Sequence, residues 1–352
     1  MKLTGRTRPH RISPSPIIAG WEWRGPRIPY PDPDIKGDTY PMTWADDGEI
    51  YASAGDPLWG ETRDGLDVEK LSGGPTDYQI AKVNPMNSYR GWGGDGPKPS
   101  GMICIKGILY LAFQNMLRTR RPPHSLRSQH GSDAQIVYST NHGAFWVPAF
   151  ENIKVPMFPG HRFGGPAFVN YGQDNAHARD EYVYAVSTDQ WDNGSSLRLG
   201  RVPADAIMQR EAWQWVCAFQ PSGEPAWNPD LDEAIPVLSI HRSISLPEMV
   251  YLAGIKRYLL FTWRLREDFS PDAGTDLLVL DAPEPWGPFS LVHAEECWEG
   301  QEFNPYCPRL PQKWLDADGQ GGWLQFSGSW GPYGQSQGYY RSNVRPFRLK
   351  MR

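Results

Sequence analysis

The sequence predicts an all-β protein, a five-bladed β-propeller. One reason is composition: the 352 residues include 36 Gly and 34 Pro, which separate many short strands and leave room for one short helix candidate, around residues 203–215. The other reason is a repeat, because a polar turn followed by a short aromatic and aliphatic strand recurs along the chain. Five units of at least three strands each are typical of five propeller blades. The repeated strands are centred on Tyr51, Tyr110, Tyr184, Tyr258 and Trp323.

Each repeated strand lies between two other strand-like segments. The preceding segments are TYPMTW, SGMICI, GPAFVNY, PEMVYLA and PRLPQKWL, and the following ones are YQIAKV, AQIVYS, SLRLGRV, TDLLVLD and YYRSNVRPFRL. The repeats are roughly 60 to 75 residues apart, which exceeds the about 40 to 45 residues of a compact blade and predicts long loops. A seven-bladed propeller, at about 50 residues per blade, is the second choice. A β-sandwich or jelly roll does not explain five recurrences of one strand order.

Two segments predict tight hairpins within blades. The segment STNHGAFW follows the strand-like AQIVY and has the pattern Ser-x-Asp-x-Gly-x-x-Trp, with Asn141 in place of Asp. In this pattern, which resembles the Asp-box of sialidase-type propellers, Asn141 caps the turn, Gly143 adopts a positive φ and Trp146 packs between blades. The segment APEPWGPF, residues 282–289, predicts a comparable hairpin. We expect a structural role for both.

The chain is expected to form one propeller domain. Residues 37–352 hold all five units, and residues 1–36 are an extension that packs on the propeller or closes it. This extension lacks the apolar core of a secretory signal, which predicts a cytoplasmic protein, or a secreted one if the numbering omits a leader. No pattern indicates an oligomeric state.

Charge and hydropathy exclude two classes of partner. The net charge is −5, and one isolated basic run at residues 118–121 is typical of a solvated loop, so no nucleic acid is expected. No apolar run approaches the roughly 20 residues that cross a membrane. The cysteines and histidines lack metal-ligand spacing, and His161 as a metal ligand has no clustered partners. We therefore expect no required cofactor or catalytic metal, although a propeller axis can hold a single structural cation.

Three carboxylates stand where side chains of a propeller reach its central funnel. Asp38, in IKGDTYPMTW, directly precedes the first inner strand, and Glu248, in SISLPEMVYLAG, begins the fourth. Two carboxyl groups facing each other would provide the acid and the base or nucleophile of glycoside hydrolysis. The alternative is a turn carboxylate at Asp38 and a solvated strand end at Glu248. Asp56 either orients a neighbour, binds a sugar hydroxyl or caps a turn, and Asp46 and Asp47 form a tight turn.

Polar and aromatic residues recur in the loops before the inner strands. Sugars need both kinds of side chain, amide or fork-shaped donors for hydroxyls and flat rings for their C–H faces. Taken alone, each such residue is more typical of a structural role than of a binding role. The coincidence over four blades nevertheless favours a carbohydrate-binding site. The candidate binding residues are Arg90, Trp92, Lys98, His161, Arg162, His241, Asn304 and Tyr306.

Several segments together resemble a known family. They are TWADDGEIYASAGD, KPSGMICIKGILYL, STNHGAFW, SLRLGRVPAD, PEMVYLAGIKRYLL and LLVLDAPEPWGPF, and the similarity spans about residues 37–348. The family consists of five-bladed propellers long described as a domain of unknown function, and some members are endo-D-arabinanases. The layout is more distantly similar to the arabinanase and fructosidase propellers. That resemblance implies that Asp38 is the first-blade base and Glu248 the fourth-blade acid. The third blade departs from it, because FGGPAFVN lacks an aspartate, and Asp56 or Asp174 would then supply the helper carboxylate.

The sequence therefore predicts a glycoside hydrolase that cleaves a furanoside-containing or related polysaccharide. A first alternative is a polysaccharide lyase, with His161 or Tyr306 as base and an arginine that neutralises a uronate. A second alternative is a propeller that binds glycans without catalysis. Whether a hydrolase retains or inverts configuration depends on the carboxyl separation, about 5–5.5 Å in the first case and 6.5–9.5 Å in the second.

Overall fold

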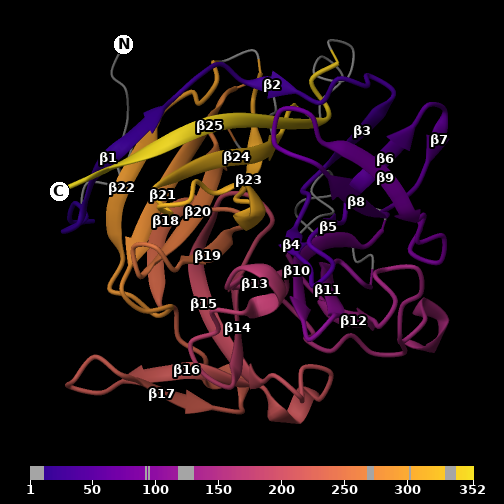
Figure 1. Ribbon diagram of the computed structural model, residues 1–352. Helices are drawn as coiled ribbons and strands as arrows, with labels where there is room; N and C mark the ends of the chain where they lie inside the picture. The colour runs from indigo at the N-terminus through magenta and orange to yellow at the C-terminus, as the bar shows by residue number, and fades with distance from the viewer. Residues whose placement is uncertain are drawn as a thin grey trace.

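The computed structural model describes residues 12–91, 93, 96–117, 131–267, 273–300, 303–329 and 338–352. There the chain forms five antiparallel sheets that follow one another in sequence, and a small sixth sheet (Figure 1). The described residues contain no α-helix, and residues 203–215 form turns and strand segments instead of the expected short helix. The helical segments are 3-10 turns: η2 Phe150–Asn152, η3 Gln173–Asn175, η4 Arg210–Ala212, η5 Leu231–Glu233 and η6 Gln312–Trp314.

The first two sheets come from the first third of the chain. In the first sheet the segment YQIAKV is the fourth strand, because a strand that the sequence pattern did not predict, β8, lies before it. The small sheet carries Asp38 and Asp56 beside the first sheet. The strands of the first sheet are β4 Met42–Trp44, β5 Ile50–Ala52, β8 Val68–Ser72 and β9 Gln79–Asn84; those of the small sheet are β3 Ile35–Asp38, β6 Gly55–Trp59 and β7 Thr62–Arg63; those of the second are β10 Lys98–Ile105, β11 Ile108–Gln114 and β12 Gln135–Ser139.

The third sheet is the widest, and its outer hairpin β16–β17 extends away from the other sheets (Figure 1). In the fifth sheet the inner strand begins two residues before the predicted segment PRLPQKWL and ends within it, and three residues of that segment form η6. The third sheet contains β13 Pro166–Phe168, β14 Tyr182–Thr188, β15 Gly194–Pro203, β16 Gln214–Phe219, β17 Pro225–Asn228 and β18 Leu238–Ile244; the fourth contains β19 Glu248–Leu252, β20 Arg257–Leu265, β21 Thr275–Ala282 and β22 Ser290–Glu295; the fifth contains β23 Tyr306–Arg309, β24 Gly321–Ser327, β25 Ser342–Met351, β1 Ile18–Trp23 and β2 Ile28–Pro29.

The inner strands meet at Asn170, which follows β13. Its Oδ1 accepts a hydrogen bond from Thr43 Oγ1 of β4 at 2.8 Å, and its Nδ2 donates to the Met102 carbonyl of β10 at 3.1 Å. Its backbone N–H donates to Met249 of β19 at 3.4 Å. Through its side-chain amide and its backbone N–H, Asn170 therefore links the inner strands of the first four sheets. Arg309 of β23 completes the circle, because its Nε donates to the Thr39 carbonyl at 2.7 Å.

Apolar side chains fill the space between successive sheets. Six buried clusters occur among the described residues, and the first and fifth sheets share one around Tyr40, Ile50 and Val344. Burial of these clusters supplies the main driving force for folding. Within the described residues, no helix is long and apolar enough to cross a membrane.

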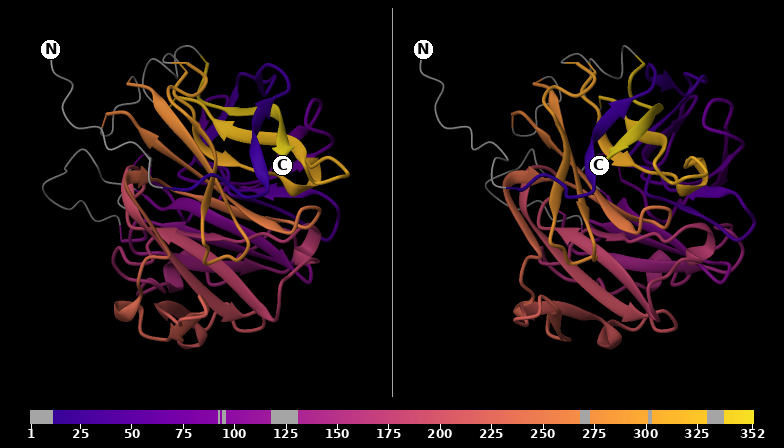
Figure 2. Two further views of the ribbon diagram at one scale, coloured as in Figure 1. Left: turned by 90° about the vertical axis from the view of Figure 1, so that its left-hand side faces the viewer. Right: turned by 60° about the vertical axis from the view of Figure 1, so that its left-hand side comes forward.

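The fifth sheet joins the two ends of the described chain. Strand β1 pairs antiparallel with β25, with Trp21 opposite Leu349, and both views of Figure 2 keep the indigo β1 beside the yellow β25. The Trp21 and Phe347 rings stack with centroids 4.0 Å apart. The N-terminal segment thus supplies an outer strand to the last sheet.

The hairpin at residues 139–146 forms as predicted. Asn141 Oδ1 accepts hydrogen bonds from Ser139 Oγ at 2.9 Å and from the Phe145 N–H at 3.0 Å. Gly143 has a φ of 87°, and Trp146 is buried between the first and second sheets. The second predicted hairpin joins β21 to β22, with Gly287 at a φ of 105° and Trp286 buried. The structural role predicted for both segments is confirmed.

Candidate active site

Asp38 ends β3 at the point where the chain turns into the first sheet. The side chain is buried, and its Oδ2 accepts a hydrogen bond from Tyr306 Oη of β23 at 2.9 Å. Burial raises the pKa of Asp38 to about 7, the charge of Asp56 adds to the rise, and the Tyr306 hydroxyl opposes it. Tyr340 also lowers this pKa, although its hydroxyl donates to the Gly55 carbonyl at 3.4 Å. Asp38 therefore gains or loses its proton near neutral pH.

Asp56 lies beside Asp38 because β3 pairs with β6, with Asp38 opposite Gly55. A side chain at position 55 would not fit, since a Cβ there would lie 2.5 Å from Asp38 Oδ1. Asp56 has a φ of 46°, a left-handed conformation that aspartate tolerates. Its carboxylate accepts the Gly93 N–H at 2.9 Å. Burial raises the pKa of Asp56, and Lys98 opposes the rise.

Lys98 is buried, and its ammonium group donates hydrogen bonds to protein oxygens. Its Nζ lies 3.0 Å from Asp56 Oδ1 and donates to the Gly91 and Gly65 carbonyls at 2.7 and 3.1 Å. An ammonium group has three hydrogens to donate, so this arrangement leaves none for a ligand. The sequence suggested sugar binding for Lys98; in the structure it instead holds Asp56 in place.

Glu248 begins β19, as expected, and is also buried. Its Oε1 accepts the Leu310 N–H at 2.9 Å, and its Oε2 accepts a hydrogen bond from Arg309 Nη1 at 3.2 Å. Burial raises the pKa of Glu248, while Arg309 and the Leu310 N–H oppose the rise. Both oxygens of this carboxyl group are therefore held by the last residue of β23 and the residue that follows it.

Arg309 links the chain segment of Asp38 to the carboxylate of Glu248. The side chain is fully buried, and it contacts Thr39, next to Asp38, as well as Glu248. Burial raises the pKa of the neighbouring Cys307 thiol, and the charges of both Asp38 and Glu248 contribute to that rise. Residues 38 and 248, 210 positions apart in the sequence, therefore act on the same buried group. The sequence reasoning missed Arg309, although a charged residue inside an apolar strand was the signal that could have identified it.

Tyr306 and Asn304 are buried next to this group. The Tyr306 ring packs against Trp191 and Trp263, with centroids 5.9 and 5.6 Å away. Burial raises the pKa of the Tyr306 hydroxyl well above its usual value, and the charge of Asp38 adds to the rise. Asn304 has a φ of 48°, and its buried Oδ1 has no hydrogen-bond partner among the residues that the structure describes. Tyr306 therefore stays protonated, and its hydroxyl donates a hydrogen bond to Asp38.

The remaining candidate binding residues are less buried. Arg162 is nearly half exposed, and its Nε lies 3.3 Å from Asp232 Oδ1 in η5, beside the outer strand β16 of the third sheet. Arg90 and His241 are exposed and His161 is half-buried, whereas Trp92 lies outside the described residues. Asp174, one of the two possible helper carboxylates, accepts the Gly107 N–H at 3.0 Å beyond the other end of the inner strands. Asp56 is therefore the helper candidate that lies beside Asp38.

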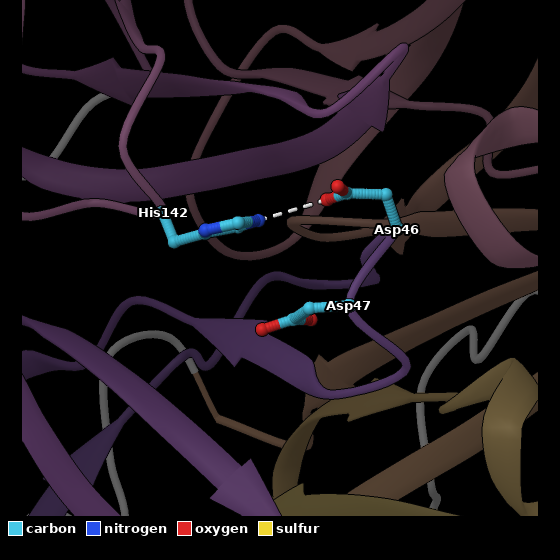
Figure 3. A group of neighbouring side chains, drawn as sticks. All are labelled: Asp46, Asp47 and His142. Carbon is cyan, nitrogen blue, oxygen red and sulfur yellow. Dashed lines mark hydrogen bonds and ion pairs between the residues drawn. The ribbon is translucent and has the colours of Figure 1, made fainter.

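One group of side chains in the described part of the chain has the composition of an ion site: Asp46, Asp47 and His142 (Figure 3). It lies in the turn after β4, past the opposite end of that strand from Asp38. His142 Nε2 is 2.9 Å from Asp46 Oδ1, and both side chains are about 40% exposed. The hydrogen bond with His142 lowers the pKa of Asp46. This hydrogen bond links the turn of the first sheet to the 139–146 hairpin. The axial cation stays a prediction.

A cavity of about 310 Å³ opens along the fourth sheet, away from the three carboxyl groups. Its walls include Trp263, Leu278 and Leu291. Its charged pair, Arg264 and Asp276, is satisfied internally, with Nε 2.7 Å from Oδ2. Two further carboxyl groups, Glu295 and Glu296, also line the cavity, and Glu295 Oε2 accepts a hydrogen bond from Trp23 Nε1 at 2.9 Å.

No family model and no curated protein matches the chain. Solved structures match over almost its whole length. An α-L-arabinofuranosidase from Podospora anserina, in complex with cellotriose, is 10% identical over 95% of this chain and 97% of that one, with a TM-score of 0.52. An endo-arabinase from Bacteroides thetaiotaomicron is 10% identical over 91% and 96%, with a TM-score of 0.50. A protein of unknown function from Dyadobacter fermentans is 12% identical over 95% and 100%, at 0.51. At such identities the likeness shows the fold alone, and it confirms the β-propeller.

Proposed function

We propose that the protein is a glycoside hydrolase that cleaves a furanoside-containing or related polysaccharide or oligosaccharide, with Asp38 and Glu248 as its acid–base pair. The observation that carries the proposal is the buried guanidinium of Arg309, which contacts the segment of Asp38 on one side and the carboxylate of Glu248 on the other. Two buried carboxyl groups with raised pKa values, brought together from distant strands, are what glycosidic cleavage requires. The activities named for two structural neighbours, an arabinofuranosidase and an endo-arabinase, support a furanoside substrate.

The roles follow from the neighbours of each group. Asp38 acts as base or nucleophile once its proton has left; burial raises its pKa, and Asp56, fixed by Lys98 and the Gly93 N–H, adds to the rise. Glu248 is the proton donor, because burial raises its pKa against the opposing charge of Arg309. Arg309 Nη2 is buried and has no hydrogen-bond partner among the described residues. It is therefore a donor available to a sugar oxygen near the two carboxyl groups.

One of the candidate bases argues against the lyase. Of the two candidate lyase bases, Tyr306 holds its proton and donates a hydrogen bond to Asp38. The other, His161, is half-buried and remains the lyase alternative that the test below addresses.

The test is a screen of reducing-end release from plant, algal and mycobacterial polysaccharides. The parent is compared with Asp38→Asn and Glu248→Gln, and with Glu224→Gln, a carboxyl-to-amide change at an exposed turn. We expect cleavage by the parent and the Glu224 variant and a loss of at least about a hundredfold in the other two. Equal cleavage by all four proteins would exclude this site. Release of unsaturated products would support the lyase, and binding without release would support a glycan-binding propeller.

A further inference from the structure

Two turns from neighbouring sheets bring three metal-binding side chains together, past the opposite end of β4 from Asp38. Asp46 and Asp47 lie in the turn between β4 and β5 of the first sheet, and His142 lies in the 139–146 hairpin of the second (Figure 3). One ligand atom of each, a carboxylate oxygen or an imidazole nitrogen, lies within 4.8 Å of the other two. Among the described residues, no other group of three His, Cys, Asp or Glu side chains meets this condition.

The protein itself holds the backbone of both turns in place. In the first turn, the Asp46 carbonyl accepts a hydrogen bond from Gln173 Nε2 at 3.3 Å. In the second, His142 has a φ of 53°, and the next residue, Gly143, donates its N–H to Ser139 Oγ at 2.9 Å. The three side chains are therefore presented by backbone that is fixed without a ligand, as a preorganised site requires.

Tyr51 orients two of the three side chains from behind. Its Oη donates to Asp47 Oδ2 at 2.9 Å, and its ring stacks on the imidazole of His142 with centroids 5.6 Å apart. The Glu49 N–H donates to the other oxygen of Asp47 at 3.0 Å. Each carboxylate oxygen has a second lone pair, so Asp47 can still bind a cation. Neighbours that fix the direction of the ligands are typical of metal sites in proteins.

His293 provides an internal comparison. Its Nε2 lies 3.1 Å from Glu295 Oε2 on the same strand, β22, and both side chains are partly exposed. Within the described part of the chain this pair has no third ligand in similar reach. The protein thus contains one hydrogen-bonded histidine–carboxylate pair with a further carboxylate beside it and one pair without.

We propose that Asp46, Asp47 and His142 bind one divalent transition-metal cation, with Zn²⁺ the best match, and that this ion clamps the first sheet to the second. An imidazole nitrogen with two carboxylate oxygens suits Zn²⁺, whereas Ca²⁺ and Mg²⁺ prefer oxygen ligands alone. Bonds of about 2.0 to 2.2 Å place the ligand atoms of a tetrahedral zinc site roughly 3.3 to 3.6 Å apart. The 2.9 Å between His142 Nε2 and Asp46 Oδ1 therefore needs only a small widening, and both side chains are about 40% exposed, which gives the ion access.

The first test is calorimetric titration of Zn²⁺ into chelator-treated protein without a histidine tag. Asp47→Asn is the sharpest variant, because Asp47 takes no part in the hydrogen bond between His142 and Asp46. We expect its affinity to fall at least about tenfold, since even changes behind the ligands cost about 10- to 100-fold. His142→Ala should abolish this binding, and His293→Ala should bind as the parent does. No binding by the parent, or binding unchanged in the Asp47 and His142 variants, would overturn the proposal, and tighter binding of Ca²⁺ than of Zn²⁺ would overturn the choice of metal.

The second test measures urea unfolding with and without Zn²⁺. A cation that binds the folded state stabilises it, so Zn²⁺ should raise the urea midpoint of the parent and of His293→Ala. The midpoints of Asp47→Asn and His142→Ala should stay unchanged on addition of Zn²⁺. Without the ion, Asp47→Asn should unfold at the midpoint of the parent, which shows that the variant folds. An equal rise in all four proteins would place the zinc elsewhere and would refute the clamp.

Discussion

Replacing Glu69 by glutamine should flatten the dependence of stability on pH. Glu69 lies in β8, is fully buried, and neither carboxyl oxygen has a hydrogen-bond partner among the described residues. Burial raises its pKa well above the usual 4.5, the charge of Asp67 raises it further, and Lys82 opposes the rise. An isolated buried carboxylate is far less stable than the neutral acid, so the folded protein holds a proton on Glu69.

The sign and the size of the effect follow from proton uptake. The unfolded chain releases this proton above about pH 4.5, whereas the folded chain keeps it, so folding takes up one proton in that range. The contribution favours the fold below the unfolded pKa and is lost as the pH rises toward the folded pKa. Each pH unit in this window lowers the free energy of unfolding by about 1.4 kcal/mol for one proton. Glutamine does not ionise, so Glu69→Gln removes that slope.

Urea unfolding at about pH 5.5 and 6.5 measures the difference. Between these values the free energy of unfolding of Glu69→Gln should fall about 1.4 kcal/mol less than that of the parent. The neighbouring Asp67, whose pKa burial raises to about 7, is present in both proteins, so its contribution cancels. Glu224→Gln should run parallel to the parent because its side chain is exposed. Parallel curves for the parent and Glu69→Gln would show that Glu69 is ionised in the fold and would refute this reasoning.

Three further predictions concern the site and the inner strands. The rate of reducing-end release should rise as the pH passes about 7, where Asp38 loses its proton. The Asp56 charge raises the pKa of Asp38, so Asp56→Asn should move this rise in rate to lower pH. A shift of the rise to higher pH would contradict this prediction. Arg309→Met should lower the free energy of unfolding by about 3 to 5 kcal/mol in urea, since it leaves Glu248 buried without its cation. Adding Glu248→Gln should restore part of this loss, and a double variant as unstable as the single one would disprove the pairing. Asn170→Ala should lower the free energy of unfolding by about 2 to 4 kcal/mol in the same measurement, because it removes the hydrogen bonds to Thr43 and Met102. A change near zero would show that these hydrogen bonds do not stabilise the fold.

The strand order could be predicted because local pattern and tertiary environment agree there. The alternating apolar runs and the 139–146 hairpin depend mainly on interactions between residues close in sequence. The hydrogen bonds of Asn141, for example, form within eight residues. Strand β8 was missed for a physical reason: its sequence VEKLS contains a glutamate that the fold buries, so its polarity hides its burial. In the fifth sheet, Pro311 cannot donate to a ladder, and the chain turns into η6 there.

The sequence indicated candidate residues for the site, but it did not indicate which groups their side chains contact. Asp38 and Glu248 were proposed because a propeller brings the starts of its inner strands together, and the structure buries both side chains. The partners of a side chain depend on packing that the sequence does not display, which is why Lys98 and Arg162 were expected to bind ligand while the structure pairs them with Asp56 and Asp232.

The pairing of β1 with β25 sets the order in which this molecule can be completed during synthesis. Ile18 is opposite Met351, so one edge of the last sheet is synthesised long before the strand with which it pairs. Until β25, which begins at Ser342, has been synthesised, the circle of sheets stays open. Such a distant pairing is intrinsically slow to form, so closure of the circle should be among the last steps of folding.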